Sequence, residues 1–349
     1  MARERIISAQ STPEDEPVAL NPALRPKQLQ EYIGQSELVE KLRISIQAAK
    51  LRKEPMEHVL LDGPPGLGKT TLAHIIAEEL NGAPPRITSG PALVRPGDLV
   101  GLLTNLVQGD VLFIDEIHRM PHVVEEYLYP AMEDFKMDFI IDSGAHANAI
   151  NLTVKPFTLI GATTRTGLLS GPMRSRFGIV HHLNFYNVAD LQKIVERSAA
   201  LLDLSADIAA LGQIAARSRG TPRVANRLLR RVRDFAVVRG HGKLTSAVVE
   251  EALKLEGIDK LGLDDLDRRF MHALARDYEG GPAGIEAIAA TMGQERDTLE
   301  DVVEPFLLQT GFIRRTSKGR QLTPAGYRHV GIARPAAPHA EPLPFNESA

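Results

Sequence analysis

The chain has 349 residues, 43% of them hydrophobic and 24% charged, which is enough for two or three ordinary globular domains. Its formal net charge is −3 and it contains no cysteine, which excludes overall basic character, disulfides, zinc fingers and a thiol nucleophile. Residues 1–17 lack the apolar core of a signal peptide, and no apolar run approaches the roughly 20 residues that span a bilayer. We therefore expect a cytoplasmic protein without a membrane partner.

The predicted elements begin after a polar arm. Residues 1–20 are dominated by charge, Pro and Ser without periodicity, so we expect a flexible arm. From 21 to 186, short apolar runs alternate with helical patterns, which is typical of an α/β domain with a parallel sheet. The clearest strands are expected at Val59–Asp62, Val111–Asp115 and 157–162. A polar and apolar stretch at about 137–154, around Gly144, predicts an inserted β-hairpin.

Helical spacing replaces this alternation farther along the chain. Residues 187–257 show only that spacing and predict a small all-α domain. A segment bounded by two glycines, 257–262, is the expected hinge. Residues 260–332 predict a third domain, made of helices followed by a basic segment with turn residues. The end of the chain, 333–349, is rich in Pro and Ala and is expected to be a disordered tail.

A glycine-rich segment, residues 63–70 (GPPGLGKT), follows the first clear strand and precedes an amphipathic helix. It matches the phosphate-binding pattern G-x-x-x-x-G-K-[ST], in which glycines such as Gly66 and Gly68 let backbone N–H groups surround phosphate oxygens. Lys69 would reach the β- and γ-phosphates of ATP, and Thr70 would bind Mg²⁺. The alternative, a chance glycine-rich turn, does not explain the flanking strand and helix.

Two carboxylates end the strand at Val111–Asp115. Asp115 would hold Mg²⁺ through water and Glu116 would polarise the attacking water, since attack on the γ-phosphate needs a metal and an oriented nucleophile. Alone, such a pair is more often a helix N-cap with an acid in the first turn. Downstream of a phosphate loop, the ATPase interpretation is favoured.

The Asp-Glu pair, together with residues 161–164 (GATT) after another apolar strand, resembles the AAA+ ATPases. In that superfamily a polar residue at the end of this strand senses the γ-phosphate. The resemblance assigns that role to Thr163, with Thr164 as second choice. A threonine that merely caps the strand end is the alternative.

Two arginine-containing segments extend the resemblance. Residues 171–178 (GPMRSRFG) resemble the segment that presents an arginine finger to a neighbouring subunit, which implies Arg176 as the finger and a structural Arg174. Residues 220–223 (GTPR) resemble the second sensor, where Arg223 would touch the nucleotide of its own subunit. A solvated surface charge is the alternative for Arg223. A finger that acts in trans implies a ring or another oligomer.

Longer segments resemble the RuvB family of AAA+ motors, and the resemblance covers roughly residues 20–332. The segments that carry this resemblance are residues 24–26, 32–35, 117–119, 128–135, 158–165, 220–235 and 309–312. The family resemblance implies an ATP-driven motor that moves double-stranded DNA to drive branch migration of Holliday junctions in recombination and repair. It also implies a homo-hexameric ring that works with RuvA and with the RuvC resolvase.

The same resemblance implies further nucleotide contacts. These residues are Leu24, Arg25, Thr71, Glu133, Asp134, Phe135 and Tyr186. In the family the hairpin docks on RuvA, which would suit an apolar tip at 139–141, although burial of those residues in their own domain is an equally good alternative. Residues 142–149 (DSGAHANA) depart from the glycine- and arginine-containing tip that the family leads us to expect.

The third domain has the plan of a winged helix: a helix at 285–292, a second helix at 299–307, and a basic turn at 311–322. The second helix is acidic and would repel a major groove, so we do not expect base reading. DNA contact is assigned to Arg296, Arg315 and Arg320, with Arg314 and Lys318 second. Phosphate contact suits a motor that runs over any sequence. A solvated hairpin or a protein contact is the alternative.

Two rival functions are compatible with an AAA+ domain. A protein unfoldase usually carries an aromatic-x-Gly pore loop, and the comparable stretch 92–103 has no aromatic residue. A replication factor or loader that is switched by ATP, without processive translocation, stays open. A small-molecule kinase would not explain Arg176, Arg223 or the basic wing.

Overall fold

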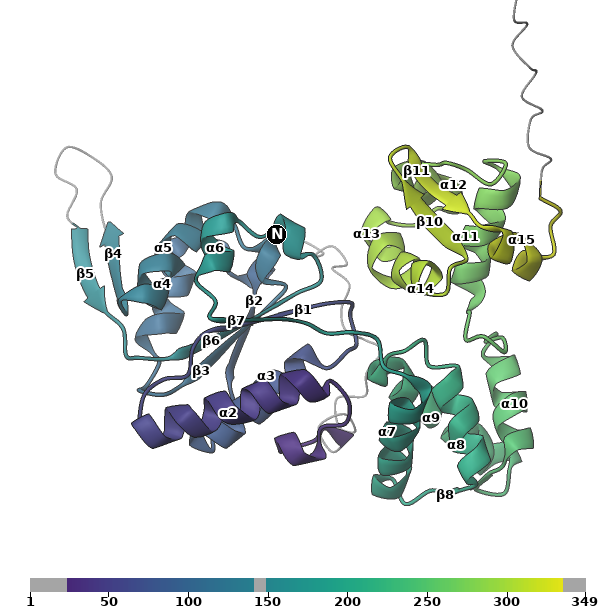
Figure 1. Cartoon of the computed structure of the whole chain (residues 1–349), viewed down its shortest axis with the longest axis horizontal. Helices are drawn as coiled ribbons and strands as arrows, with labels where there is room; N and C mark the ends of the chain where they lie inside the picture. Colours follow the sequence, from purple (N-terminus) through teal and green to yellow (C-terminus); the bar gives the residue numbers. More distant parts are fainter. Residues whose placement is uncertain (1–23, 141–148, 335–349) are drawn as a thin grey trace, which may run out of the picture. The chain divides into compact units, whose positions relative to one another are not determined.

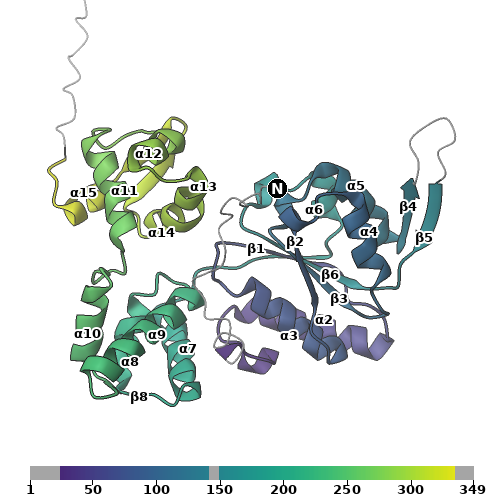
Figure 2. The same cartoon turned by 180° about the vertical axis from the view of Figure 1, so that it is seen from behind.

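The computed structural model describes residues 24–140 and 149–334 (Figures 1 and 2). The chain divides into two compact units between Ala252 and Leu253. The predicted arm at 1–20 and residues 335–349 of the predicted tail lie outside the described residues. Within the described residues, no helix combines the length and the apolar character needed to cross a membrane.

The first unit opens with an α/β domain. Its helices and strands, in chain order, are η1 (Leu29–Glu31), α2 (Ser36–Arg52), β1 (Val59–Asp62), α3 (Lys69–Asn81), β2 (Arg86–Ser89), η2 (Gly90–Ala92), α4 (Pro96–Thr104), β3 (Val111–Asp115), η3 (Ile117–Arg119), α5 (His122–Glu133), β4 (Lys136–Ile140), β5 (Ala149–Thr153), β6 (Thr158–Thr163), η4 (Thr166–Leu168), α6 (Gly171–Ser175) and β7 (Ile179–His182).

Five of these strands form one parallel sheet in the order β2-β3-β6-β1-β7. The three strands expected from the sequence are confirmed, the last of them beginning one residue later than predicted. Because all five strands run in parallel, their carboxyl ends share one edge, where Asp62 pairs in register with Thr163 and Ser89 with Asp115. Asp115 is the last residue of β3, and Glu116 follows it at the same edge. This edge gathers the polar residues on which the predicted chemistry depends.

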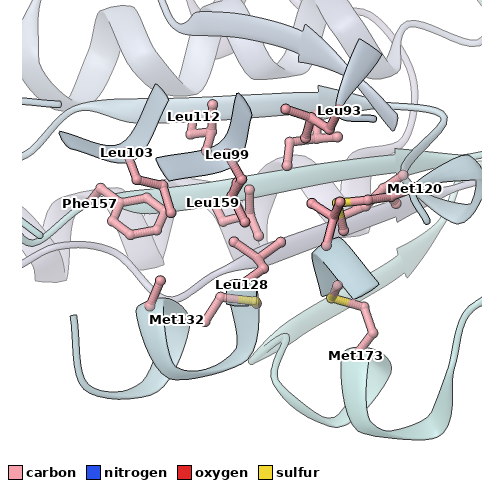
Figure 3. Packing of buried hydrophobic residues seen from close by; sticks show 14 of the residues in the cluster. Leu93, Leu99, Leu103, Leu112, Met120, Leu128, Met132, Phe157, Leu159 and Met173 are labelled. Atoms are coloured by element: carbon pink, nitrogen blue, oxygen red, sulfur yellow. The ribbon is translucent and has the colours of Figure 1, made fainter. Parts of the chain in front are cut away.

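Helices cover both faces of the sheet, with α2 and α3 on one and α4 and α5 on the other (Figures 1 and 2). Between the sheet and α4 and α5, Leu99 and Leu128 pack with Leu112 and Leu159 of the strands (Figure 3). All four are fully buried. Complete burial of one such leucine stabilises the fold by about 1.5–3 kcal/mol, so this core holds the polar edge in a rigid frame.

The predicted hairpin is confirmed as the antiparallel pair of β4 and β5. Met137 and Val154 are buried at its base and belong to the core of the α/β domain. Residues 141–148 and the side chains at 139–140 and 149–150 lie outside the described part of the structure. The expectations about an apolar tip and its docking partner therefore stay predictions.

The rest of the first unit is helical. It contains α7 (Val188–Leu201), α8 (Ile208–Ala216), α9 (Pro222–Arg239) and α10 (Ser246–Leu255), with the two-residue strands β8 (Ser205–Ala206) and β9 (Lys243–Leu244). Its last helix, α10, ends at Leu255, just past the boundary between the units. The side chain of Asn187 caps α7 by accepting a hydrogen bond from the amide of Asp190. Helices α7, α8 and α9 pack on one another through their apolar faces. The helical domain expected from the spacing is present, with one short parallel strand pair added.

The second unit is a winged helix. It contains α11 (Asp265–Arg276), α12 (Ile285–Met292), α13 (Arg296–Thr298), the π-helical turn η5 (Leu299–Val303), α14 (Glu304–Gln309), β10 (Ile313–Thr316), β11 (Gly319–Leu322) and α15 (Pro324–Val330). Strands β10 and β11 form the antiparallel wing. The predicted second helix is thus a composite of α13, η5 and α14 rather than one regular α-helix. In the expected hinge, Asp259 accepts hydrogen bonds from the amides of Leu261 and Leu263.

Candidate functional site

The phosphate loop links β1 to α3 and depends on glycine. Gly66 and Gly68 have φ angles of 84° and 101°, which side chains rarely adopt. A Cβ atom on Gly68 would lie 2.9 Å from the hydroxyl oxygen of Tyr32, and one on Gly66 would lie 3.0 Å from the Cβ of Arg223. The loop is therefore packed closely between the N-terminal segment and the start of α9.

Lys69 begins α3 with its side chain buried in the loop. Its ammonium donates hydrogen bonds to the carbonyl oxygens of Gly63 at 2.6 Å and Pro64 at 3.0 Å. Burial lowers the pKa of Lys69, while the carboxylates of Glu116 and Asp115 oppose that shift. The loop thus holds a cation beside the two acidic residues at the end of β3.

Two tyrosines contact the loop, Tyr32 from the residue after η1 and Tyr186 from the segment before α7. The hydroxyl of Tyr186 donates to that of Tyr32 at 2.9 Å, and Tyr32 donates to the carbonyl oxygen of Leu67 at 3.3 Å. Burial raises the pKa of Tyr186 to about 12 and that of Tyr32 well above its usual value. Both hydroxyls stay protonated at neutral pH and tie the loop to the segment that enters α7.

Glu116 follows β3 in a left-handed conformation, with a φ angle of 47°. One carboxylate oxygen, Oε2, accepts a hydrogen bond from the hydroxyl of Thr164 at 3.2 Å and lies 3.2 Å from Nδ1 of His118. The same imidazole nitrogen is 2.8 Å from the hydroxyl oxygen of Thr163. Thr164 therefore contacts Glu116 directly, whereas His118 links Thr163 to Glu116.

Arg176 lies immediately after α6 and is held by its own domain. Its guanidinium lies 4.6 Å from the centre of the Tyr129 ring and makes an ion pair of 3.1 Å with Glu133. Nη1 donates to the carbonyl oxygen of Pro172 at 2.8 Å. Arg174, the other arginine of this segment, donates to the carbonyl oxygen of Thr166.

The wing arginines are paired with the acidic helix. Arg315 and Arg320 both bind the carboxylate of Glu304, and Arg320 also binds Glu300. Arg296 pairs with Glu300 at 3.3 Å and with Glu286 at 2.9 Å, beyond the wing. The acidic residues that were expected to repel DNA are thus directed at the arginines that were expected to bind it.

Comparison with known proteins identifies all three parts of the chain. Residues 24–183 match the model of the Holliday junction DNA helicase RuvB P-loop domain, 186–259 the RuvB AAA lid domain, and 260–331 the RuvB C-terminal winged helix domain. A curated relative from Kosmotoga olearia, the Holliday junction branch migration complex subunit RuvB, is 55% identical over 331 residues, which cover 95% of this chain and 96% of that one. The chain belongs to the RuvB family.

Solved structures agree with this family. Thermotoga maritima RuvB, described as a Holliday junction branch migration motor, is 50% identical, with a TM-score of 0.83 over 90% of this chain and 100% of that one. A point mutant of the same protein gives a TM-score of 0.84 at 49% identity, over 89% of this chain and 99% of that one. As a RuvB protein, the chain carries an AAA+ ATPase domain that binds nucleotide.

A cavity of about 270 Å³ lies within the first unit and collects most of the predicted nucleotide contacts. The predicted residues that line it are Leu24, Arg25, Gly66, Gly68, Lys69, Thr70, Thr71, Asp115, Glu116, Tyr186 and Arg223. Both the phosphate loop and α9 contribute to this wall. The amide of Arg223 donates to the carbonyl oxygen of Gly66 at 3.3 Å, so the start of α9 contacts the loop directly.

The other predicted site residues of this RuvB protein lie elsewhere. Arg176, Glu133, Asp134, Phe135 and Thr163 do not line the cavity. Glu133 contacts Arg176 instead, so the two form one cluster on α5 and α6.

Sequence reasoning missed several lining residues. They are Tyr32, Ile33, Ile194, Arg197, Asn226 and Arg230. A signal was available on α9, where Arg223, Asn226 and Arg230 recur at intervals of three and four and therefore share one helical face.

The residues in the cavity fit a nucleotide with its metal ion. Thr70 and Asp115 both line it and offer the two oxygen ligands that Mg²⁺ commonly takes from a protein when phosphates and water supply the rest. Among the described residues, no group of three or more His, Cys, Asp or Glu side chains could hold a metal by itself. The donor set suits an ion bound through phosphate oxygens.

Proposed function

We propose that this RuvB protein uses ATP hydrolysis to pull duplex DNA and so drives branch migration of Holliday junctions in recombination and repair. The observation that carries the proposal is the placement of its charged groups. A cation in the phosphate loop, two carboxylates and Arg223 face one cavity, while Arg176 lies outside it. This is the arrangement of a site that needs a second copy of the chain.

Each side chain has a role that follows from its position. Lys69 would exchange the loop carbonyls for β- and γ-phosphate oxygens, and Thr70 and Asp115 would hold Mg²⁺, which neutralises charge on the phosphates. Glu116 would orient the attacking water and accept its proton. Thr164, and Thr163 through His118, would keep the Glu116 carboxylate in place. Arg223 would respond to the γ-phosphate from the start of α9.

Arg176 would complete the site of a neighbouring copy. A guanidinium supplied in trans stabilises charge on the transferring phosphoryl group. Tyr129 and Glu133 hold this guanidinium in its own subunit, and Glu133, Asp134 and Phe135 would reach the nucleotide from the same side. In a closed ring of six copies around DNA, every ATP site would receive Arg176 from the neighbouring copy.

DNA contact would be made by the winged helix. Arg296, Arg315 and Arg320 belong to one charged network on the wing and the acidic helix. Contacts of arginines with phosphate give affinity without base reading and fall steeply with salt. A motor that passes over any sequence needs this kind of grip.

Partners follow from the family and not from the described contacts. The relatives are named for Holliday junction branch migration, which implies RuvA at the junction, docking at the β4–β5 hairpin, and RuvC in the resolving complex. Action on chromosomal DNA would place the protein in the cytoplasm.

The proposal is tested by ATP-dependent dissociation of a synthetic four-way junction, with and without RuvA. We expect wild-type protein to separate the arms, and Glu116→Gln to bind ATP and DNA without moving the junction. ATP hydrolysis by wild type that never moves the junction, even with RuvA, would instead support the alternative of an ATP-switched loader.

A further inference from the structure

The acidic side of the winged helix has no role in the proposed motor, yet it contains a fully buried carboxylate, Glu304, that is paired with two arginines. We propose that Glu304, assisted by Glu300, is a positioning residue that holds Arg315 in the orientation that binds the DNA backbone. The inference rests on the proposed function, because it deepens the assignment of DNA contact to the wing.

Glu304 is fully buried and receives two guanidinium groups at once. Arg315 donates from Nε at 2.6 Å and from Nη2 at 2.8 Å, one bond to each carboxylate oxygen. Arg320 donates from Nε at 2.9 Å and from Nη2 at 3.0 Å in the same manner. Paired hydrogen bonds of this type fix the plane of a guanidinium as well as its distance.

The local backbone explains how an acid reaches this buried place. The π-helical turn η5 immediately precedes Glu304 and shifts its side chain relative to a regular helix. Burial alone would raise the pKa of Glu304, but the hydrogen bonds from Arg315 and Arg320 hold that pKa below its usual value. Glu304 therefore stays ionised at neutral pH.

The wing itself requires this anion. Arg315 and Arg320 are directly opposed across β10 and β11, and like charges at opposed positions destabilise a strand pair. The carboxylate of Glu304 lies between them and offsets that repulsion. A neutral side chain at this position would leave the two cations to separate.

The two arginines differ in exposure, and we assign them different roles for that reason. The side chain of Arg315 is 58% exposed, whereas that of Arg320 is only 14% exposed. Arg320 also binds Glu300 at 3.1 Å, and Glu300 in turn pairs with Arg296, which is 51% exposed. Arg320 is thus an interior link, and Arg315 and Arg296 are the charges presented to solvent.

Such a network suits a nonspecific grip on phosphate. A long arginine normally loses side-chain entropy when it binds, and an arginine that is already held in place loses less. The acidic residues therefore strengthen DNA binding by Arg315 although their own charge opposes it. Removal of the negative charge of Glu304 is therefore predicted to weaken DNA binding, whereas electrostatic repulsion alone would predict tighter binding.

The test is the affinity of the full-length protein for a fluorescent duplex, measured by anisotropy over a series of salt concentrations without ATP. Glu304→Gln removes a negative charge but is expected to weaken binding about fivefold to tenfold, with a salt slope smaller by about one phosphate contact. Glu295→Gln, which removes the same charge from an exposed position nearby, is the matched control. It is expected to bind as well as wild type or slightly better.

Two further variants separate positioning from loss of folding. Arg315→Ala should reproduce the weakened binding and the smaller slope with Glu304 left in place. Glu304→Gln combined with Arg315→Ala should bind no more weakly than Arg315→Ala alone, because Glu304 is proposed to act through that arginine. Thermal unfolding of each variant shows whether the winged helix remains folded.

The outcomes distinguish the two claims. Equal or tighter binding by Glu304→Gln, or a further loss of affinity when Glu304→Gln is added to Arg315→Ala, would overturn the positioning role and leave the motor intact. No duplex binding by wild type would overturn the proposed DNA contact and the positioning role together.

Discussion

At the scale of single residues, the side chains around Glu116 show how the carboxylate that we propose to orient the attacking water is held. His118 directs Nδ1 at both Glu116 and Thr163, and Thr164 donates to the same carboxylate oxygen. Glu116 also has a left-handed backbone, a conformation that persists only where the surrounding structure holds it.

We expect His118→Ala to lower kcat for ATP hydrolysis by about tenfold or more, with little change in ATP affinity, because the carboxylate loses its support. His118→Asn should recover part of the rate, since the amide nitrogen of Asn can take the place of Nδ1. The measurements are steady-state ATPase activity and ATP binding by calorimetry. Equal loss in both variants, or a loss of ATP affinity, would contradict a positioning role.

Tyr186 makes a prediction about alkaline pH. Its pKa is raised to about 12 by burial, above the value near 10 of an exposed tyrosine. The neutral hydroxyl therefore contributes stability that is fully present below pH 10 and is lost as pH rises toward 12. Tyr186→Phe should unfold with a weaker pH dependence than wild type over this range, measured by urea denaturation. Parallel curves for the two proteins would show that Tyr186 is not the group responsible.

At the scale of elements, the turn after β2 supports the turn after β3. A Cβ on Gly90 would lie 2.4 Å from the carbonyl oxygen of Glu116 and 2.9 Å from the amide nitrogen of Met120. Backbone atoms cannot move aside cheaply, so any side chain at Gly90 would displace the segment that carries Glu116.

Gly90→Ala is therefore expected to abolish most ATPase activity and to destabilise the fold by roughly 1–3 kcal/mol. Gly101→Ala is its control, because Gly101 lies within α4 and has no atom within 4 Å of an added Cβ. That variant should keep its activity and gain about 0.5–1 kcal/mol. The measurements are the ATPase rate and the melting temperature of each variant. Normal activity in Gly90→Ala would contradict the close packing around Gly90.

Regular elements were predictable because each depends on neighbours in sequence. The strands β1, β3 and β6, the hairpin and the wing follow from apolar runs and turn residues, and the structure confirms them. The phosphate loop was predictable because its glycines, Lys69 and Thr70 act from one short segment. Thr70 and Asp115, from distant segments, also reach the same cavity as expected.

Side-chain contacts between different elements could not be predicted from local sequence patterns. The contact of Glu304 with Arg315 and Arg320 depends on a π-helical turn and on the register of the wing, neither of which has a local sequence signal. The bond between His118 and Thr163 likewise joins residues 45 positions apart. Acidic residues on a predicted DNA-binding helix were therefore interpreted by their charge alone.

At the scale of the whole molecule, the account depends on a site that one copy of the chain cannot complete. Arg223 and the two carboxylates line the cavity of their own subunit, whereas Arg176 is held on α5 and α6 away from it. Movement of DNA by a ring would follow from hydrolysis that passes between copies. The central claim is therefore that Arg176 acts in trans.

The most direct measurement mixes two inactive variants and records the ATPase rate as their ratio changes. The Glu116→Gln variant keeps Arg176 but cannot hydrolyse ATP in its own site. The Arg176→Ala variant keeps an intact ATP site but cannot donate Arg176 to its neighbour. If the finger acts in trans, each variant alone is nearly inactive, and mixtures recover activity that is greatest near equal amounts. A mixture no more active than the average of its two parents would contradict the shared site.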